Sequence, residues 1–448
     1  MSQDLSALTE RMLTAARKAG ADTADALAVD GTSVSIDVLG GKLEHAERSE
    51  GVEIGLRVMI GQQQAVVSSS LFDDATLTTM AERAVAMARE APEDPHIGLA
   101  DADQLATDTD ASALELYDPT PEPSAEQLED DAKRTEAAAL AYEGISQVQA
   151  ASAGYGQKRI HLATSNGFSG GYQRSSRSVS CVAITGEGTG MERDYYGDGR
   201  IFQAEVESPE HIGQQAAERT LERANARRPK TGAYPVIFDE RVAGALIGHL
   251  LVASNGSMIA RGSSWLLDKL GEQVLPKGMD LFEDPHRARI SGSKPFDGEG
   301  LPTAPRHIVK DGVLQGWTLD LANARKLGMD STGSAARGTS SPPSPSMSNV
   351  ALTQGDKSRT ELMAEMGTGL LVTSMIGSTI NPNTGDYSRG ASGLWVENGE
   401  AQYAVNECTV AGNLLDMLRG MTAANDARTH VGRVVPSLLV EGLTLAGE

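Results

Sequence analysis

The sequence contains few cysteines and few aromatic residues. Only two cysteines, Cys181 and Cys408, occur in 448 residues, and they lie far apart in the chain. This number excludes a disulfide framework, so we expect two free thiols, buried as small hydrophobic side chains in a reducing compartment. Phe, Trp and Tyr together make up 4% of the residues. The cores must therefore consist mainly of Leu, Val, Ile, Met and Ala.

Positive charge is also scarce. The formal net charge is −22 at pH 7, and a field of that sign repels phosphate backbones, which disfavours nucleic-acid binding. The longest apolar run, residues 242–253, is interrupted by His249 and is too short to span a bilayer. The first residues, 1–5, lack the basic and apolar regions of a secretion signal. We therefore expect a soluble cytoplasmic protein that does not bind membranes.

The sequence also lacks the short motifs of common catalytic sites. None of the eight histidines is followed by Glu, which excludes metal-binding motifs that begin with His-Glu. Gly167, Gly170 and Gly171 do not form a phosphate-binding fingerprint between a strand and a helix. No nucleophile stands beside a recognisable base. The residues by themselves therefore predict an ordinary globular protein, 40% hydrophobic and 22% charged.

The pattern that is present indicates an α+β protein. Apolar residues at helical spacing between Leu5 and Ala16 predict a first helix, and those between Leu77 and Ala88 predict a second. Between them, alternating apolar residues at 34–38, 52–58 and 65–69 predict an antiparallel sheet. We assign this helix–strands–helix module, an N-terminal α/β module, to residues 1–115.

The same order of elements recurs in a middle α/β module, residues 120–230. The capping box Ser124-Ala125-Glu126-Gln127 predicts the start of a helix. Strands are expected between Val148 and Val206, followed by a helix that starts at Ser208-Pro209 and ends near Pro229. The rest of the chain, residues 231–448, reads as a β-rich C-terminal domain. Its long irregular segment, residues 331–345, is of a kind that is usually functional or mobile.

The stretch from Gly367 to Glu400 predicts a β-meander. Strands are expected at 370–376 and 393–396, and Asn398-Gly399 predicts a tight hairpin turn that leads to a third strand. Between the first two strands lies a polar corner, Gly-Asp-Tyr-Ser-Arg-Gly, at residues 385–390. No metal cluster or phosphate loop accompanies it.

This stretch resembles the C-terminal domain of the TldD/PmbA family, and its motif GDYSRGA…WVENGE resembles the PmbA (TldE) branch. Further matching segments are spread over most of the chain, at residues 191–195, 294–297, 308–312 and 324–328. The resemblance implies a subunit of a zinc peptidase that is built from two related chains.

The resemblance also implies where a zinc site would lie. TldD-type subunits carry a His-Glu-x-x-x-His motif on a helix and a Cys near the C-terminus. Here Gly244 stands in place of the first histidine and Ala245 in place of the general base, and only His249 matches. Residues 431–435 hold no Cys. We therefore expect no metal on this chain, with zinc on the partner, and we interpret His249 as a packed helix histidine.

Four residues of the meander are candidates for a substrate or partner cleft: Asp386, Tyr387, Arg389 and Trp395. Trp, Tyr and Arg are enriched at interface hot spots. The alternative is that Asp386 and Arg389 stabilise a structural turn through side-chain bonds to the backbone or an ion pair. No catalytic residue is predicted in this chain.

The resemblance predicts a PmbA/TldE-type subunit that shapes the cleft of a TldD-type partner and binds extended, unfolded peptides, such as modified-peptide precursors or antitoxins. Two alternatives remain. One is a protein-binding regulator of the gyrase-modulator type, and the other is a self-sufficient homodimeric hydrolase. A homodimer is also possible in the absence of the partner.

Overall fold

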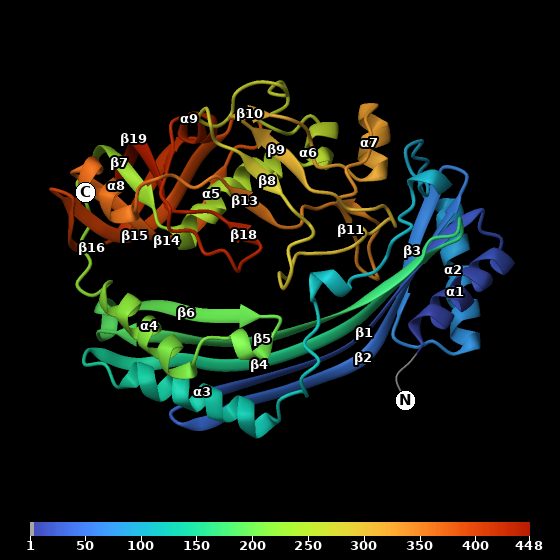
Figure 1. Ribbon diagram of the computed structural model, residues 1–448, viewed down its shortest axis with the longest axis horizontal. Coiled ribbons are helices and arrows are strands. Elements are labelled where there is room, and N and C mark those ends of the chain that lie inside the picture. The colour runs from blue at the N-terminus through green and yellow to red at the C-terminus, as the bar shows by residue number, and fades with distance from the viewer. Residues whose placement is uncertain (1–3) are drawn as a thin grey trace.

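The N-terminal half is one long curved sheet with helices on its outer face, as the computed structural model shows (Figure 1). The structure describes residues 4–448, without the side chain of Ser378, so most of segment 1–5 lies outside the described residues. The elements of this half are α1 Leu5–Ala19, β1 Thr23–Leu39, β2 Lys42–Ile60, β3 Gln63–Ser69, α2 Asp74–Glu90, α3 Ala125–Leu140, β4 Ile145–Thr164, β5 Ser169–Thr185, β6 Glu192–Arg200 and α4 Pro209–Leu221.

The two predicted modules share this sheet. Its strand order is β3-β2-β1-β4-β5-β6, and β1 pairs with β4 from Asp25 opposite Thr164 to Val38 opposite Ala151. β1 and β4 are so long that the pair α1 and α2 and the pair α3 and α4 both pack on the same face of the sheet. Ala24, Ala26 and Ala28 of β1 pack under α1 and α2, whereas the later even-numbered residues from Val34 to Val38 pack under α3 and α4.

The helices begin where the sequence predicts. Asp4 caps α1 by accepting from the Ala7 N–H at 3.0 Å, and Gly20 ends the helix with a φ of 96°. The predicted capping box at Ser124 is present at the start of α3. The helix predicted to end near Pro229 ends earlier, at Leu221, because turns follow and Asn225 adopts a positive φ of 58°.

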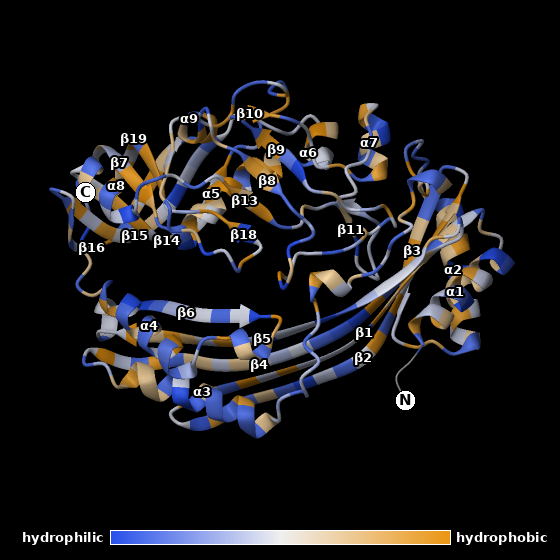
Figure 2. Cartoon of the chain, in the orientation of Figure 1, coloured by the Kyte–Doolittle hydropathy of each residue, from blue (hydrophilic) through white to orange (hydrophobic). Residues whose placement is uncertain are grey.

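The C-terminal domain is built on two sheets around one hydrophobic core, with strand orders β16-β15-β14-β7-β19-β17 and β10-β9-β8-β13-β18. Hydrophobic residues are dense on β7, β8 and β19 (Figure 2). The predicted α+β class is confirmed. The elements are β7 Gly232–Phe238, α5 Glu240–Ala253, α6 Gly256–Ala260, β8 Leu281–Glu283, β9 Arg306–Lys310, β10 Val313–Leu314, α7 Leu321–Leu327, β11 Ala335–Ala336, β12 Ser344–Pro345, β13 Val350–Leu352, α8 Arg359–Met366, β14 Gly369–Ile380, β15 Asp386–Glu397, β16 Glu400–Asn413, α9 Leu414–Arg419, β17 Thr422–Ala423, β18 Arg433–Val434 and β19 Leu438–Ala446.

The predicted meander is β14-β15-β16, with longer strands than the sequence indicated. The turn residues Asn398 and Gly399 have φ of 53° and 80°, as a tight hairpin requires. The polar corner is not a turn, because β15 already begins at Asp386, which pairs with Asn413 of β16. Both edges of this strand are paired, one with β14 and the other with β16.

The irregular segment 331–345 of the C-terminal domain packs against the sheet near the start of β1 and the end of β2. Arg337 forms an ion pair with Asp25 of β1, which also pairs with Arg57 of β2 at 2.5 Å. The backbone of Thr339 lies so close that a Cβ added at Gly55 would be 2.1 Å from its carbonyl oxygen. This segment is therefore a packed contact between the two halves.

Candidate functional site

A cavity of about 850 Å³ lies at a second contact between the two halves. Its walls come from β5 and β6 of the long sheet and from the start of α5, β14, β15 and β16 of the C-terminal domain. Its lining residues are Gln149, Val182, Ile184, Met191, Glu192, Arg193, Asp194, Tyr195, Arg223, Arg241, Val242, Thr373, Ser374, Met375, Ile376, Ser392 and Asn406.

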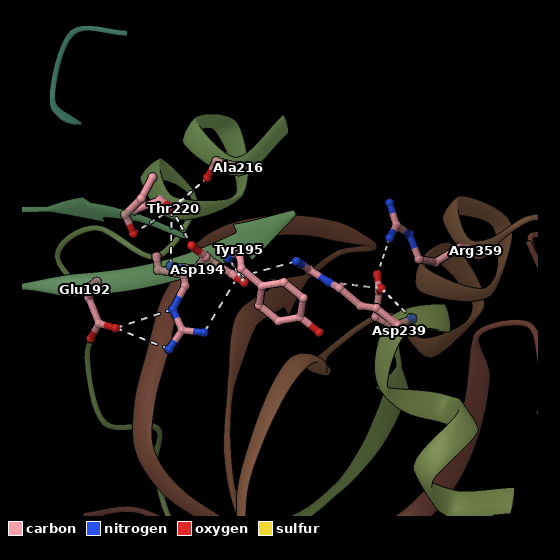
Figure 3. A network of polar contacts seen from close by, with 10 residues as sticks. Glu192, Asp194, Tyr195, Ala216, Thr220, Asp239 and Arg359 are labelled. Carbon is pink, nitrogen blue, oxygen red and sulfur yellow. Dashed lines mark hydrogen bonds and ion pairs between the residues drawn. The ribbon is translucent and has the colours of Figure 1, made fainter. Parts of the chain in front are cut away.

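Charged side chains of both halves form a network (Figure 3), and several of them line this cavity. Asp194 of β6 is 7% exposed and lies 3.7 Å from the guanidinium of Arg223 and 3.4 Å from that of Arg241 on α5. Arg241 also contacts Asp239 at 3.2 Å, and Asp239 pairs with Arg359. Because Asp194 and Arg241 belong to different halves, their ion pair fixes the two walls of the cavity relative to each other.

The segment Met191–Tyr195 supplies both polar and apolar groups to the cavity. The charges of this segment do not pair with one another. Glu192 lies 3.3 Å from Arg223 and accepts a hydrogen bond from Asn406, whereas Arg193 donates to Gln149 at 3.0 Å. Alternation along the strand buries Asp194 and leaves Tyr195 62% exposed.

Two strand edges without a partner strand line the cavity. β6 is the last strand of the long sheet, but at Asp194 its outer edge contacts the Thr220 hydroxyl, which accepts from the Asp194 N–H at 3.2 Å and lies 3.4 Å from its carbonyl oxygen. β14 pairs with β7 only at residues 370–372, so no described strand pairs with that edge of 373–376. Near these edges lie Met191, Tyr195 and Ile376, which are 49%, 62% and 76% exposed. Unpaired edges bind extended chains through backbone hydrogen bonds, and exposed apolar groups contact their side chains.

Of the four predicted site residues, Asp386 and Arg389 have the structural contacts of the alternative interpretation. Asp386 is exposed, accepts from the Thr384 hydroxyl at 2.7 Å and lies 3.4 Å from the Asn413 amide nitrogen. Arg389 is half-buried, and its Nε donates to the carbonyl oxygen of Gly377 at 2.7 Å. None of the four lines the cavity at β6.

Tyr387 and Trp395 are buried in the core of this chain, with exposures of 2% and 6%. The Tyr387 hydroxyl lies 3.2 Å from the Met375 sulfur. Trp395 packs edge-on against Tyr234, with ring centroids 5.0 Å apart, and its Nε1 donates to Glu397 at 3.0 Å. The four candidates therefore do not share one surface. Strand alternation and bulges in β15 decide which side chains face the core, and the sequence does not reveal the bulges.

The helix expected to carry a degenerate metal site is α5. Gly244, Ala245 and His249 lie on it, and Arg433 of β18 donates from Nη1 to the Gly244 carbonyl oxygen at 3.1 Å. Burial, together with the charges of Arg389 and Arg433, lowers the pKa of His249 to about 4. Within residues 4–448, no group of three or more His, Cys, Asp or Glu side chains is placed to hold a metal. One histidine beside a guanidinium does not fit zinc.

The two cysteines are free and buried, as expected. Burial and the nearby Glu136 carboxylate raise the pKa of Cys181 to about 12. Burial raises the pKa of Cys408 to about 11. Both thiols therefore stay protonated near neutral pH and are poor nucleophiles.

Sequence reasoning missed Arg223, Arg241, Asp239 and Arg433. Asp239 carried a usable signal, since an Asp directly after a predicted strand often caps the next helix, and it does cap α5. The ion pairs carried none, because Asp194 and Arg241 belong to distant parts of the chain. No helix in residues 4–448 is long and apolar enough to cross a membrane.

Comparisons with known proteins agree with the fold. Domain 1, the central domain and the C-terminal domain of the PmbA/TldA metallopeptidases match residues 24–88, 118–224 and 231–447. The chain is 37% identical over 421 residues to the metalloprotease PmbA of Escherichia coli O157:H7, covering 93% of this chain and 90% of that protein. It is 38% identical to a PmbA homologue of Haemophilus influenzae, covering 96% and 94%.

Solved structures share the whole fold. A Bacteroides thetaiotaomicron protein described as a modulator of DNA gyrase superposes with a TM-score of 0.92 at 27% identity, covering all of both chains. TldE from Thermococcus kodakarensis superposes with a TM-score of 0.84 at 18% identity, covering 98% of this chain and all of TldE. At that identity the second likeness shows the fold alone.

Proposed function

Because the chain belongs to the PmbA/TldD metallopeptidase family, we propose that it is the PmbA/TldE-type subunit of a two-subunit zinc peptidase of the cytoplasm. In this proposal a TldD-type partner holds the zinc and hydrolyses the peptide bond. The present chain holds the substrate and completes the cleft. The observation that carries the proposal is the cavity at β6 and β14, where the unpaired strand edge of residues 373–376 and exposed apolar side chains lie together.

This cavity suits an extended peptide. A peptide that adds a strand to residues 373–376 of β14 forms backbone hydrogen bonds that depend little on its sequence. Folded proteins have few free strand edges and cannot enter as a single extended chain. We therefore propose small unfolded peptides as substrates, including precursors of modified peptides and antitoxins.

The α5 region supports a division of labour between the subunits. Gly244 and Ala245 replace a ligand and a base in this chain, and the Arg433 guanidinium lies against the same helix. We propose that this chain binds no zinc of its own. Its contribution is to position the peptide, and correct positioning of reactants can lower a barrier by several kcal/mol.

The test is to purify this chain and a TldD-type partner separately and to follow cleavage of an unstructured peptide. A folded protein of similar composition is the control substrate. We expect cleavage only in the mixture, loss with a chelator, recovery with zinc and a preference for the unstructured peptide. Metal analysis of this chain alone should find no stoichiometric zinc.

Three outcomes would contradict the proposal. Equal cleavage by the partner without this chain would remove its role in hydrolysis and favour a regulator, which a supercoiling assay with DNA gyrase would then test. Chelator-resistant cleavage by this chain alone would indicate a self-sufficient hydrolase. One tightly bound zinc per chain, lost in His249→Ala, would mean that α5 does hold metal.

A further inference from the structure

One side of α5 is shaped to hold an arginine. The Nη1 of Arg433 donates to the Gly244 carbonyl oxygen. A Cβ added at Gly248 would lie 3.0 Å from this Nη1, and one added at Gly244 would lie 3.4 Å from the Arg433 Cδ. Any longer side chain at these two positions would displace the guanidinium. The glycines therefore keep a cation beside His249.

Arg389 is a second guanidinium near His249. It lies close to the hydroxyl of Tyr387, whose ring packs edge-on against the His249 ring with centroids 5.9 Å apart. Charge from both arginines reaches the imidazole and, with burial, favours its neutral form. The group formed by Arg389, Arg433 and His249, which we name the α5 cation site, thus carries two positive charges at neutral pH.

The two charges of the α5 cation site are not balanced. In the part of the chain that the structure describes, neither Arg389 nor Arg433 forms an ion pair. Arg433 donates to the Gly244 carbonyl oxygen, and Arg389 donates to that of Gly377 and also contacts the Tyr387 hydroxyl. The nearby Arg223 and Arg241, in contrast, both pair with Asp194. The Nε2 of His249 is buried without a hydrogen-bond partner among the described residues.

We propose that the α5 cation site binds a carboxylate group of the substrate peptide, either its C-terminal carboxylate or an Asp or Glu side chain. This inference rests on the proposed function, since it supplies a specific contact to a peptide held at β6 and β14. Arg241 and Val242, in the first turn of α5, line that cavity, so the helix leads from it to His249.

The chemistry favours a carboxylate. A guanidinium presents five N–H donors in a planar fork, which matches the two oxygens of a carboxylate. The chain carries 61 acidic and 39 basic residues, so most of its surface repels an acidic group. The two unpaired arginines therefore attract a carboxylate against the field of the rest of the chain, and the net charge of −22 reduces their effect.

Binding can be measured with the whole chain and three fluorescently labelled peptides of one unstructured sequence. The first ends in a free carboxylate, the second in an amide, and the third in an amide with one internal Glu. We expect the parent chain to bind the first or the third on the order of tenfold more tightly than the second. The peptide that binds tightly identifies the source of the carboxylate.

Arg433→Gln and Arg389→Gln should each remove most of this difference without changing binding of the amide. Arg261→Gln is the matched control, because Arg261 is exposed and likewise donates from Nε to a backbone carbonyl, that of Ser257, at 3.0 Å. It should leave the difference intact. Thermal unfolding of each variant checks the fold, and the second arginine variant keeps the test valid if the first does not fold.

The outcomes separate this inference from the proposed function. If all three peptides bind equally and the mixture with the partner cleaves them, the cation site is wrong and the proposed function stands. If none binds, N-acetylalanine and N-acetylalaninamide test the site directly by nuclear magnetic resonance. Binding of the acid alone, lost in Arg433→Gln, would support the site while refuting the peptide cleft, and binding of neither would overturn both.

Discussion

Two of the contacts between the C-terminal domain and the long sheet contain the same kind of buried Arg–Asp ion pair but differ in their surroundings. At the segment 331–345, the side chains of Arg337 and Asp25 are each 2% exposed, and the backbone of Thr339 fills the space above Gly55. At β6, Asp194 and Arg241 are also paired and largely buried, yet a cavity of about 850 Å³ opens beside them. The first place is a closed contact and the second is open.

The difference shows that a buried Arg–Asp pair does not by itself mark a functional site. What distinguishes the open contact is its neighbours, Tyr195 and Ile376, which expose apolar surface beside unpaired strand edges. At the closed contact, burial by itself would raise the pKa of Asp25, but Arg337 and Arg57 outweigh it and hold the pKa below its usual range. We expect the closed contact to govern stability and the open one to govern activity.

Asp25→Ala should have the largest effect on stability. The substitution leaves Arg57 and Arg337 buried without their carboxylate, which should lower the free energy of unfolding by about 3–5 kcal/mol. Urea unfolding followed by circular dichroism measures the loss. Glu50→Ala, which removes a partner of the solvent-exposed Arg48, is the control and should have no measurable effect. Equal unfolding midpoints for the two variants would contradict the closed contact.

A buried carboxyl group of the C-terminal domain should also make stability depend on pH. Burial and the nearby Asp297 carboxylate raise the pKa of Glu299 to about 8, from an ordinary value of 4.5. The folded chain thus keeps this group protonated where the unfolded chain ionises it, and its stabilising effect is lost as pH rises from 4.5 through 8. Raising the pH from 5 to 8 should lower the unfolding free energy by about 2–4 kcal/mol through Glu299.

Glu299→Gln isolates this contribution. The amide oxygen can still accept the hydrogen bond that the Leu321 N–H donates to Glu299 at 2.9 Å. Urea unfolding of parent and variant at a series of pH values is the measurement. The variant should become more stable than the parent as the pH rises, and parallel profiles would mean that Glu299 ionises normally.

Arg241→Gln should have a smaller effect on stability, about 1–2 kcal/mol, because Asp194 remains paired with Arg223 and Asp239 remains paired with Arg359. It should reduce peptide cleavage by the mixture on the order of tenfold, since the two walls of the cavity lose their link. Unfolding and cleavage are measured on the same preparation. A variant that loses stability but keeps full activity would show that the open contact is only structural.

Ile376→Ser should have the smallest effect on stability, within about 0.5 kcal/mol, because the side chain is 76% exposed. The KM for an unstructured peptide should rise severalfold with little change in kcat, as for a lost binding contact. Leu71→Ser is the matched control, because Leu71 is 64% exposed and lies outside the cavity. Equal KM values for both variants would argue against a peptide on β14.

Local signals in the sequence were sufficient for most elements of the fold. Asp4 and Ser124 cap helices where the pattern predicts, and Asn398-Gly399 closes its hairpin. These features depend on residues within a few positions of one another. The family resemblance, too, rests on short segments such as Met191–Tyr195, although the chemistry of that segment becomes visible only with Arg223 and Arg241 beside it.

The features that were missed depend on distant pairing. Nothing in the alternation of residues 34–38 indicates that β1 continues the sheet through β4 instead of ending it. Trp395 has the residue type of an interface hot spot, but it fills the core against Tyr234. Arg433 lies on a two-residue strand, and only the folded chain brings it to Gly244 and Gly248.

The pairing of β1 with β4 in the long sheet also has a consequence for synthesis of the chain. β1, 17 residues long, can pair with β2 as soon as both leave the ribosome, but its other edge waits for β4, which ends at Thr164. That edge stays open on the order of ten seconds at ordinary translation rates. An open strand edge of this length invites pairing with other nascent chains. The smallest unit that can fold safely therefore extends from α1 at least through β4, and a ribosome that pauses within α3 prolongs the exposure.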